Sequence, residues 1–283
     1  MTVCKVCQGP VFEKYLLHDF TIYCCGLCDL HMIDYLDTPA STALDLGDTQ
    51  YIETQLQHNQ RKFIEQANLC CDVVPRVGVI LDVGCGGGAF LKIMRNRGYY
   101  AEGIEVHPLR RAYCQNAGLT IHDTPVETWP ASSRFDLITL WDVIEHVNDP
   151  RATLEAAFAQ LKVGGVVILD TPSRDALFYR FGELTSRLSG GRWPTLLGSM
   201  YSAQPFGHKQ IFSDRGMEDL LHRSGFRSIR IFRKFELSFP VEFYLRRLLR
   251  NETLARACAL PARALIAALP VRNKVVAIGK KFQ

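Results

Sequence analysis

The stretch that decides the fold runs Val79-Ile80-Leu81-Asp82-Val83-Gly84-Cys85-Gly86-Gly87-Gly88-Ala89-Phe90-Leu91. It begins as an apolar run broken by one aspartate, passes through four glycines in five positions, and ends in an apolar-periodic segment. This succession predicts a buried strand, a tight turn and a helix. Glycines allow positive φ and close approach of a ligand, and a helix start offers free N–H groups. We therefore expect a ligand-binding loop.

The glycine spacing alone leaves the ligand open. Gly84, Gly86 and Ala89 fit the dinucleotide fingerprint G-x-G-x-x-G/A, with Glu105 placed about 20 residues on to hold a ribose. Asp82 separates the interpretations, because a carboxylate just before the loop repels a pyrophosphate and attracts a positively charged ligand. We favour a cationic ligand, and a dehydrogenase is the alternative.

Three motifs occur in order along the chain. The pattern Asp-x-Gly-x-Gly-x-Gly at residues 82–88 resembles motif I of the class I S-adenosylmethionine-dependent methyltransferases. Residues 135–150, with their Glu-His pair and trailing Asp-Pro, resemble motif IV of the ubiquinone-biosynthesis O-methyltransferases and their relatives. Residues 161–172 resemble motif VI. The resemblance implies an α/β fold, a Rossmann-like open sheet of seven strands, with S-adenosylmethionine as cofactor.

The same resemblance implies a set of cofactor-binding residues. The acid and the glycines of the first loop would hold the amino-acid end of S-adenosylmethionine. The acid after the second strand would hold its ribose. The end of the third strand, together with one aromatic residue, would hold the adenine. In chain order the expected residues are Asp82, Gly84, Gly86, Gly88, Glu105, Asp123, Thr124 and Trp141.

Two histidines are candidates for a catalytic base, since an ordinary histidine pKa of about 6.5 suits proton removal near neutrality. His146 belongs to the motif IV segment, where it could equally be a helix residue with a hydrogen bond near Glu145. His208 lies in residues 205–213, which resemble a histidine-containing segment of zinc-ribbon methyltransferases. The deoxysugar C-methylating branch has Tyr-x-Glu-His there, whereas this chain has Pro-Phe-Gly-His, which disfavours C-methylation.

Five of the ten cysteines lie within the first 28 residues. Two Cys-x-x-Cys pairs separated by seventeen residues match the spacing of a four-thiolate zinc site. We expect one structural zinc ion on Cys4, Cys7, Cys25 and Cys28, with Cys24 as a less favoured substitute for Cys25. Unligated thiols or a redox pair are the alternatives.

The expected organisation has three parts. Residues 1–36 form a zinc ribbon, residues 37–75 a linker and helix, and residues 76–283 the S-adenosylmethionine-binding domain. That domain carries two insertions. The first, 174–209, is rich in aromatic residues and glycines and is expected to be a substrate lid, and the second, 237–271, is expected to be helical.

Composition limits the partners. The chain has a formal net charge of +4 and is 47% hydrophobic, which is ordinary for a globular protein and far from a dedicated nucleic-acid binder. It shows no apolar run of the roughly 18 residues a membrane span needs, and no signal peptide at its start. We expect a cytoplasmic protein. A zinc-ribbon RNA methyltransferase is an alternative, although the amide-binding motif Asn-Pro-Pro-aromatic is absent.

The expected function is methyl transfer to a small-molecule acceptor, with O-methylation of a sugar, lipid or natural-product hydroxyl favoured. A sugar C-methyltransferase and a silent cofactor-binding protein are further alternatives. Residues 239–269 combine leucines with arginines, which predicts contact with a membrane or a hydrophobic substrate, or packing in the core or in a homodimer.

Overall fold

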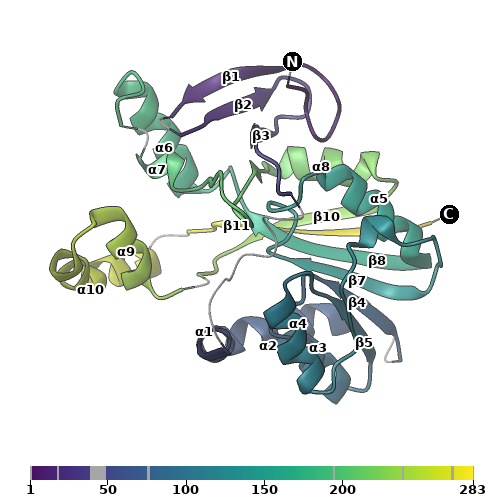
Figure 1. The fold of residues 1–283 in the computed structure, drawn as a ribbon. Coiled ribbons are helices and arrows are strands. Elements are labelled where there is room, and N and C mark those ends of the chain that lie inside the picture. Colours follow the sequence, from purple (N-terminus) through teal and green to yellow (C-terminus); the bar gives the residue numbers. More distant parts are fainter. Residues whose placement is uncertain are drawn as a thin grey trace.

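The computed structural model describes residues 2–17, 19–38, 49–74, 77–193, 195–237, 239–268 and 271–282. Most of the expected linker falls on residues 39–48, which lie outside the described residues, as does Leu269. The main feature is a seven-stranded sheet (Figure 1). In spatial order its strands are β10 (Arg227–Lys234), β11 (Lys274–Lys280), β8 (Leu161–Pro172), β7 (Phe135–Trp141), β4 (Val79–Val83), β5 (Tyr100–Ile104) and β6 (Ile121–His122).

Pairing within this sheet is mixed. The strands from β8 to β6 are parallel, whereas β11 is antiparallel to both β8 and β10. The chain order reverses between β4 and β7, so the carboxyl ends of these strands open a crevice of the kind in which α/β sheets bind ligands. The seven strands and the antiparallel edge pair confirm the expected fold class.

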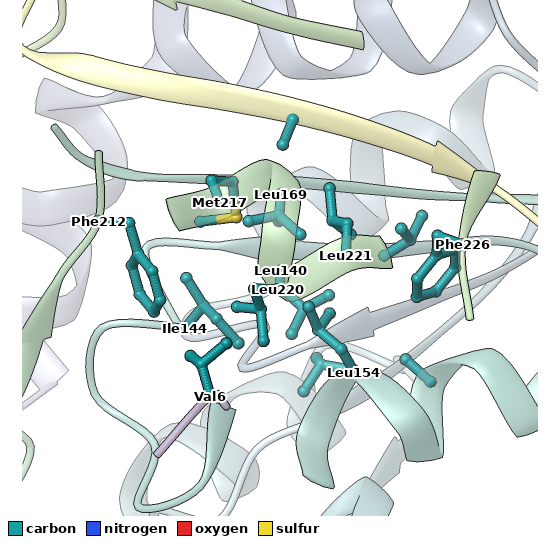
Figure 2. Packing of buried hydrophobic residues seen from close by; sticks show 14 of the residues in the cluster. Val6, Leu140, Ile144, Leu154, Leu169, Phe212, Met217, Leu220, Leu221 and Phe226 are labelled. Carbon is teal, nitrogen blue, oxygen red and sulfur yellow. The ribbon is translucent and has the colours of Figure 1, made fainter. Parts of the chain in front are cut away.

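Successive side chains along each strand point to opposite faces of the sheet, so that they enter two apolar layers in turn. On β8, Val167 and Leu169 enter one layer, and Val166 and Ile168 enter the other. Figure 2 shows the first layer, where β7 and β8 meet α5 (Pro150–Gln160), α8 (Asp214–Arg223) and Val6 of the amino-terminal segment. The helices of the second layer are α2 (Gln60–Cys71), α3 (Ala89–Asn96) and α4 (Pro108–Asn116).

The helix expected before the first strand of the large sheet is divided. It forms α1 (Thr49–His58) and α2, which begins after Asn59. The Asn59 side chain donates to the carbonyl of Gln55 at 3.0 Å. The backbone N–H of Asn59 donates to the same carbonyl at 3.1 Å, and the N–H of Phe63 donates to the carbonyl of Asn59 at 3.1 Å, so the backbone bonds continue across the division.

The cysteine-rich segment forms a second, smaller sheet. Its antiparallel strands are β1 (Val11–Leu16), β2 (Thr21–Cys25), β3 (His31–Ile33) and β9 (Gln210–Ile211). Strand β9 comes from the far half of the chain and pairs with β3. The expected boundary at residue 36 therefore lies within a unit to which a distant segment contributes a strand.

Both expected insertions contain helices. The first holds α6 (Leu177–Leu188) and α7 (Thr195–Gly198), beside β1 and β2 in Figure 1. The second holds α9 (Val241–Leu249) and α10 (Glu252–Ala268), which stand apart from the sheet. A short 3-10 turn, η2 (Val126–Thr128), follows β6. Among the described residues, no helix has the length and apolar character to cross a membrane.

Gly88 and Gly98 offer a matched test of the loop's packing, because both have positive φ. A Cβ on Gly88 would lie 2.4 Å from Cδ1 of Leu119, whereas among described residues nothing lies within 4 Å of one on Gly98. We expect Gly98→Ala to lower the free energy of unfolding by about 1–2 kcal/mol through backbone strain alone. Gly88→Ala should cost about 1–3 kcal/mol more through overpacking. Urea unfolding measures both, and equal losses would contradict the crowding at Gly88.

Candidate active site

The glycine loop is held against the end of β5. The N–H groups of Gly84 and Cys85 both donate to the carbonyl of Ile104, at 2.8 and 3.0 Å. Gly84 and Gly86 have φ of 72° and 56°, a region that favours glycine. A Cβ on Gly84 would lie 2.6 Å from Cγ2 of Val143, whereas one on Gly86 would meet no described atom within 4 Å. Gly84 is thus required for packing, whereas the space beside the Cα of Gly86 is open.

Two carboxylates flank this loop. Asp82, at the end of β4, accepts a hydrogen bond from the Thr139 hydroxyl at 2.6 Å, and burial raises its pKa to about 7. Glu105 follows β5 and accepts from the N–H groups of Gly86 at 3.0 Å and His107 at 2.8 Å. Burial also raises the pKa of Glu105. Both carboxyl groups lie in a poorly solvated place where a cation or hydroxyl ligand would find acceptors.

A cavity of about 1980 Å³ opens over the loop. It reaches from the strand ends past α1 and α2 to the two insertions, so that α6 and the α9–α10 pair form its outer walls. Most of the expected cofactor residues line it, namely Asp82, Gly84, Gly86, Glu105 and Trp141. Gly88, Asp123 and Thr124 are not among the lining residues, and the wall near β6 consists of residues 125–128.

The structure does not bring all expected adenine contacts together. Trp141 ends β7 and packs edge-on against Phe90, with ring centroids 5.8 Å apart. Thr124 follows β6 and accepts a hydrogen bond from the Trp129 indole at 3.0 Å. Strands β7 and β6 are separated by β4 and β5, which places their ends roughly 14 Å apart. The roles of Asp123 and Thr124 stay predictions.

The two candidate bases do come together. The rings of His146 and His208 lie with centroids 4.8 Å apart, and a ligand atom from each lies within 4.8 Å of a Glu145 oxygen. Glu145 is fully buried, and within the described part of the chain neither carboxylate oxygen has a hydrogen-bond partner. Burial, followed by the charge of Asp142, raises its pKa to about 7. Two imidazoles and a carboxylate can share protons or bind a divalent cation.

The tautomer of His208 follows from its partner. Its Nδ1 lies 3.0 Å from the carbonyl oxygen of Met200, which can only accept, so Nδ1 carries the proton. The neutral ring therefore keeps a lone pair on Nε2. Burial and the neighbouring His146 hold the pKa of His208 below its ordinary value, so the ring is neutral at pH 7.

The segment after His208 ties this cluster to the small sheet. The N–H of Lys209 donates to the carbonyl of Glu145, and the carbonyl of Lys209 accepts from Ile33, both at 2.8 Å. The Lys209 ammonium, fully buried, donates to the His146 carbonyl at 2.5 Å and to Asp37 at 2.8 Å. The sequence analysis did not single out Lys209. Its position directly after the candidate base His208 was the only sequence feature that could have drawn attention to it.

An ion network lies beneath the cavity and joins α2 to the strand ends. Lys62 donates to Asp142 at 2.6 Å, and Lys274 lies 2.6 Å from Glu236. The two lysines hold the pKa of Asp142 well below its ordinary value, although burial alone would raise it. The network comprises Lys62, Lys234, Lys274, Asp142, Asp170 and Glu236. No local sequence pattern marks Lys62, which sits on a helix far from these acids in the chain.

The four expected zinc ligands converge. The Sγ atoms of Cys4 and Cys28 lie 3.3 Å apart, those of Cys7 and Cys25 lie 3.4 Å apart, and all four are within 4.8 Å of one another. Tetrahedral zinc–sulfur bonds of about 2.3 Å require sulfurs about 3.8 Å apart. The N–H groups two residues after Cys4 and Cys25 point at their sulfurs, 3.4 Å away. The residues fit a zinc ion with four thiolates.

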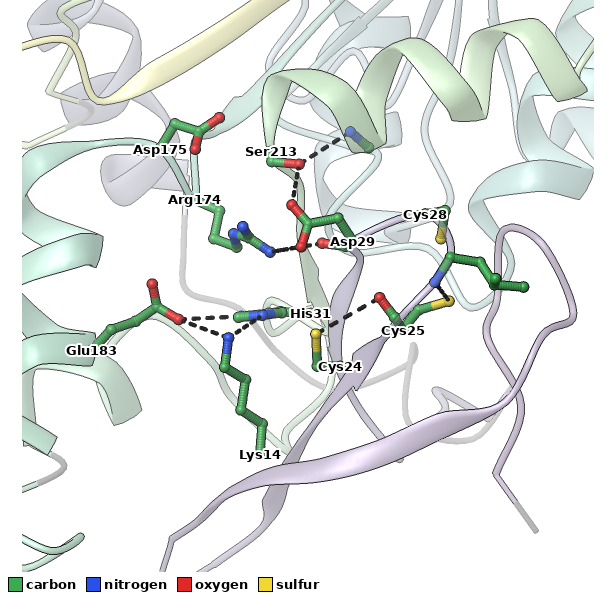
Figure 3. Close-up of polar contacts among 12 residues, drawn as sticks. Lys14, Cys24, Cys25, Cys28, Asp29, His31, Arg174, Asp175, Glu183 and Ser213 are labelled. Atoms are coloured by element: carbon green, nitrogen blue, oxygen red, sulfur yellow. Dashed lines mark hydrogen bonds and ion pairs between the residues drawn. The ribbon is translucent and has the colours of Figure 1, made fainter. Parts of the chain in front are cut away.

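The same small sheet contacts the first insertion through polar groups (Figure 3). His31 lies 2.8 Å from the Tyr179 hydroxyl. It also lies 3.1 Å from the Lys14 ammonium, which pairs with Glu183 at 3.3 Å. Arg174 donates to Asp29 at 2.5 Å. Cys24, Asp29 and His31 could together hold a metal ion. The two cations already bound to Asp29 and His31 make that use unfavourable.

A family model described as a methyltransferase domain matches residues 55–231, more than half of the chain. The ubiquinone biosynthesis O-methyltransferase of Psychrobacter arcticus is 37% identical over 112 residues, 36% of this chain and 44% of that protein. That of Cereibacter sphaeroides is 35% identical over 103 residues, 34% of this chain and 42% of that protein. The chain thus spans less than half the length of these curated relatives.

Solved structures share the fold at low identity. A methyltransferase dependent on S-adenosylmethionine from Archaeoglobus fulgidus has a TM-score of 0.53 and 14% identity, covering 83% of this chain and 100% of that one. A possible histamine N-methyltransferase from Thermotoga maritima has a TM-score of 0.52 and 16% identity, covering 82% and 95%. The strand order and these neighbours define the class I methyltransferase fold. The chain belongs to the S-adenosylmethionine-dependent methyltransferase family.

The cysteine cluster generates a test of ligand identity. We expect the purified protein to contain one zinc ion per chain. Cys25→Ala should lose the ion and Cys24→Ala should keep it, because Sγ of Cys24 contacts the backbone carbonyl of Cys25, 3.7 Å away, and is not one of the four clustered sulfurs. Elemental analysis after gel filtration measures the zinc content. Zinc-free wild-type protein, or zinc lost from the Cys24 variant, would contradict this assignment.

Proposed function

We propose that this protein transfers the methyl group of S-adenosylmethionine to a hydroxyl group of a small molecule with a large apolar part. The observation that carries the proposal is the position and hydrogen bonding of His208. Its Nδ1 is committed to the Met200 carbonyl, so Nε2 is available as a base in a cavity shared with the glycine loop. The relatives named ubiquinone biosynthesis O-methyltransferases support oxygen as the acceptor atom.

The residues around the glycine loop suit the proposed cofactor. The open space beside Gly86 would admit the cofactor, and the two flanking carboxylates would hold its positive charge and its ribose. When bound, S-adenosylmethionine supplies an electrophilic methyl group. Asp82 attracts the positive charge, and Glu105 keeps lone pairs free for hydroxyl groups beyond those used by Gly86 and His107.

The chain's own groups then handle the acceptor. His208 takes the hydroxyl proton as the acceptor oxygen approaches the methyl group, and the carboxylate of Glu145 lies close enough to stabilise the resulting imidazolium. Holding the acceptor at near-attack distance, with water excluded, supplies most of the rate. The ion pair between Lys62 and Asp142 fixes α2 over the same space.

The outer cavity favours an apolar acceptor. Its walls carry aromatic and aliphatic side chains from α6, α9 and α10, including Phe178, Phe181, Phe243, Leu248 and Ile266. A folded RNA would need a charged groove in their place, so the RNA alternative is less favoured. The zinc ion is proposed to be structural, since four thiolates leave no position open. The homodimer and the cytoplasmic location stay predictions.

Asp82 generates a pH-dependent expectation. Its pKa of about 7 in the cofactor-free protein means that acidification protonates the group that must attract the cation. Affinity for S-adenosylmethionine should therefore fall roughly tenfold from pH 7.5 to pH 6.0. Calorimetric titration at the two pH values measures this.

Asp82→Asn serves as the control for that titration. It should bind more weakly at pH 7.5 and lose most of the difference between the two pH values, because the amide does not titrate. If wild type and variant respond identically to pH, Asp82 does not contact the cation.

His208→Ala should lower turnover by about 10²–10⁴-fold and leave cofactor affinity unchanged, because the base is removed and the loop is not touched. The acceptor is first identified by incubating the enzyme with methyl-labelled S-adenosylmethionine and a cell extract, followed by mass spectrometry. His222→Ala, on the outer side of α8, is the matched control and should retain full activity.

Two further measurements define the role of the histidine cluster. Turnover that persists in both His208→Ala and His146→Ala would exclude a histidine base. A count of two metal ions per chain, with one lost in His208→Ala, would show that the cluster binds a cation that activates the hydroxyl. One ion per chain would mean that no cation binds at the histidine cluster and that His208 itself accepts the proton.

A further inference from the structure

Helix α6 presents its apolar side to solvent. Tyr179, Gly182 and Ser186 form its buried face against the small sheet. On the opposite side, Leu177, Phe181, Leu184 and Leu188 recur at helical spacing and remain 49–80% exposed. This is the reverse of the usual arrangement, in which the apolar stripe of a helix faces the core.

The α9–α10 pair forms a second exposed apolar surface across the cavity from α6. Phe243, Tyr244 and Leu248 of α9 and Leu265 of α10 are 39–60% exposed and also line the cavity. The cavity therefore opens to solvent between two apolar rims rather than polar ones. Figure 1 shows α9 and α10 projecting from the sheet on the same side of the molecule as α6.

Positive charge is concentrated on the same two segments. Residues 174–193 contain four arginines and two acidic residues, and residues 239–268 contain five arginines and two acidic residues. Together the segments carry a formal charge of +5, whereas the whole chain carries +4, so the rest of the chain is slightly acidic. Several of these arginines are exposed around the rims: Arg180, Arg187, Arg192, Arg246, Arg256 and Arg263.

We propose that the two rims dock onto a membrane leaflet that contains anionic lipids, with the cavity mouth facing the bilayer. Apolar side chains surrounded by arginines are the composition of helices that lie in the membrane interface. Among the described residues no helix can span a bilayer, so contact is peripheral. RNA bases stack on aromatic side chains but make no comparable use of exposed leucines, which both rims carry. That the acceptor enters from the bilayer rests on the proposed function, but docking itself does not.

The test is co-sedimentation with vesicles, which needs no acceptor and no turnover. The full chain is mixed at 50 mM NaCl with vesicles of phosphatidylcholine alone or with one quarter phosphatidylglycerol. We expect binding to the anionic vesicles, at least tenfold weaker binding to neutral ones, and weakening at 500 mM NaCl, because screening removes the arginine contribution.

The double variant Leu188→Asp with Leu260→Asp should weaken vesicle binding at least tenfold. These side chains are 80% and 76% exposed and do not line the cavity, so folding and activity should be preserved. Val163→Asp is the matched control, because Val163 is 70% exposed and lies at the start of β8, outside both rims. Circular dichroism and melting temperature check that all variants are folded.

Three results would overturn the proposal. The first is no binding of the wild type to anionic vesicles at 50 mM NaCl. The second is equal binding by the double variant and the Val163 control. The third is a dimer in sedimentation velocity that the double variant dissociates while vesicles are not bound, which would show that the rims pack against a second copy. Loss of vesicle binding with intact methylation of a soluble acceptor would separate this failure from failure of the proposed function.

Discussion

The backbone of Lys209 connects the chemistry of this protein to its metal-binding segment. Its N–H is bonded to the loop that carries Glu145 and His146, and its carbonyl is bonded to β3 of the small sheet. His208 is the adjacent residue, so its position depends on both contacts. The side chain of Gln210 adds bonds at 2.8 Å to the carbonyls of Ile144 and Val147. The small sheet is thus a structural wall of the site, and a zinc ion on the four clustered cysteines would stabilise that wall.

Much of the fold could be predicted because the central strands β4, β5 and β7 are short segments rich in apolar residues, each followed directly by a glycine or an acid. The convergence of the four cysteines was also predictable, since Cys-x-x-Cys spacing is a local property of the chain. The pairing of β9 with β3 was not, because about 180 residues separate the two strands and neither carries a pattern that names its partner.

The candidate site was predicted in part. Asp82, Gly84, Gly86 and Glu105 were found because they stand at strand ends, where topology places ligands, and the structure brings them to one cavity. Trp141 was expected to share the adenine site with Asp123 and Thr124, because chain order does not reveal the spatial order of the strands. In the structure two strands lie between the end of β7, which carries Trp141, and the end of β6, which precedes Asp123. Glu145 was quoted within its motif but given no role, since burial without a hydrogen-bond partner is visible only in three dimensions.

The position of β11 has a consequence for how the polypeptide acquires its structure. This strand lies between β8 and β10, although it comprises residues 274–280, so an interior row of the sheet is supplied by nearly the last segment described. A ribosome must therefore synthesise both insertions before the hydrogen bonds along β8 can be satisfied. Until then β8 has an open edge that another chain could pair with. The position of β11 delays completion of the core until both insertions have been synthesised, and during that interval the edge of β8 is exposed to pairing with other chains.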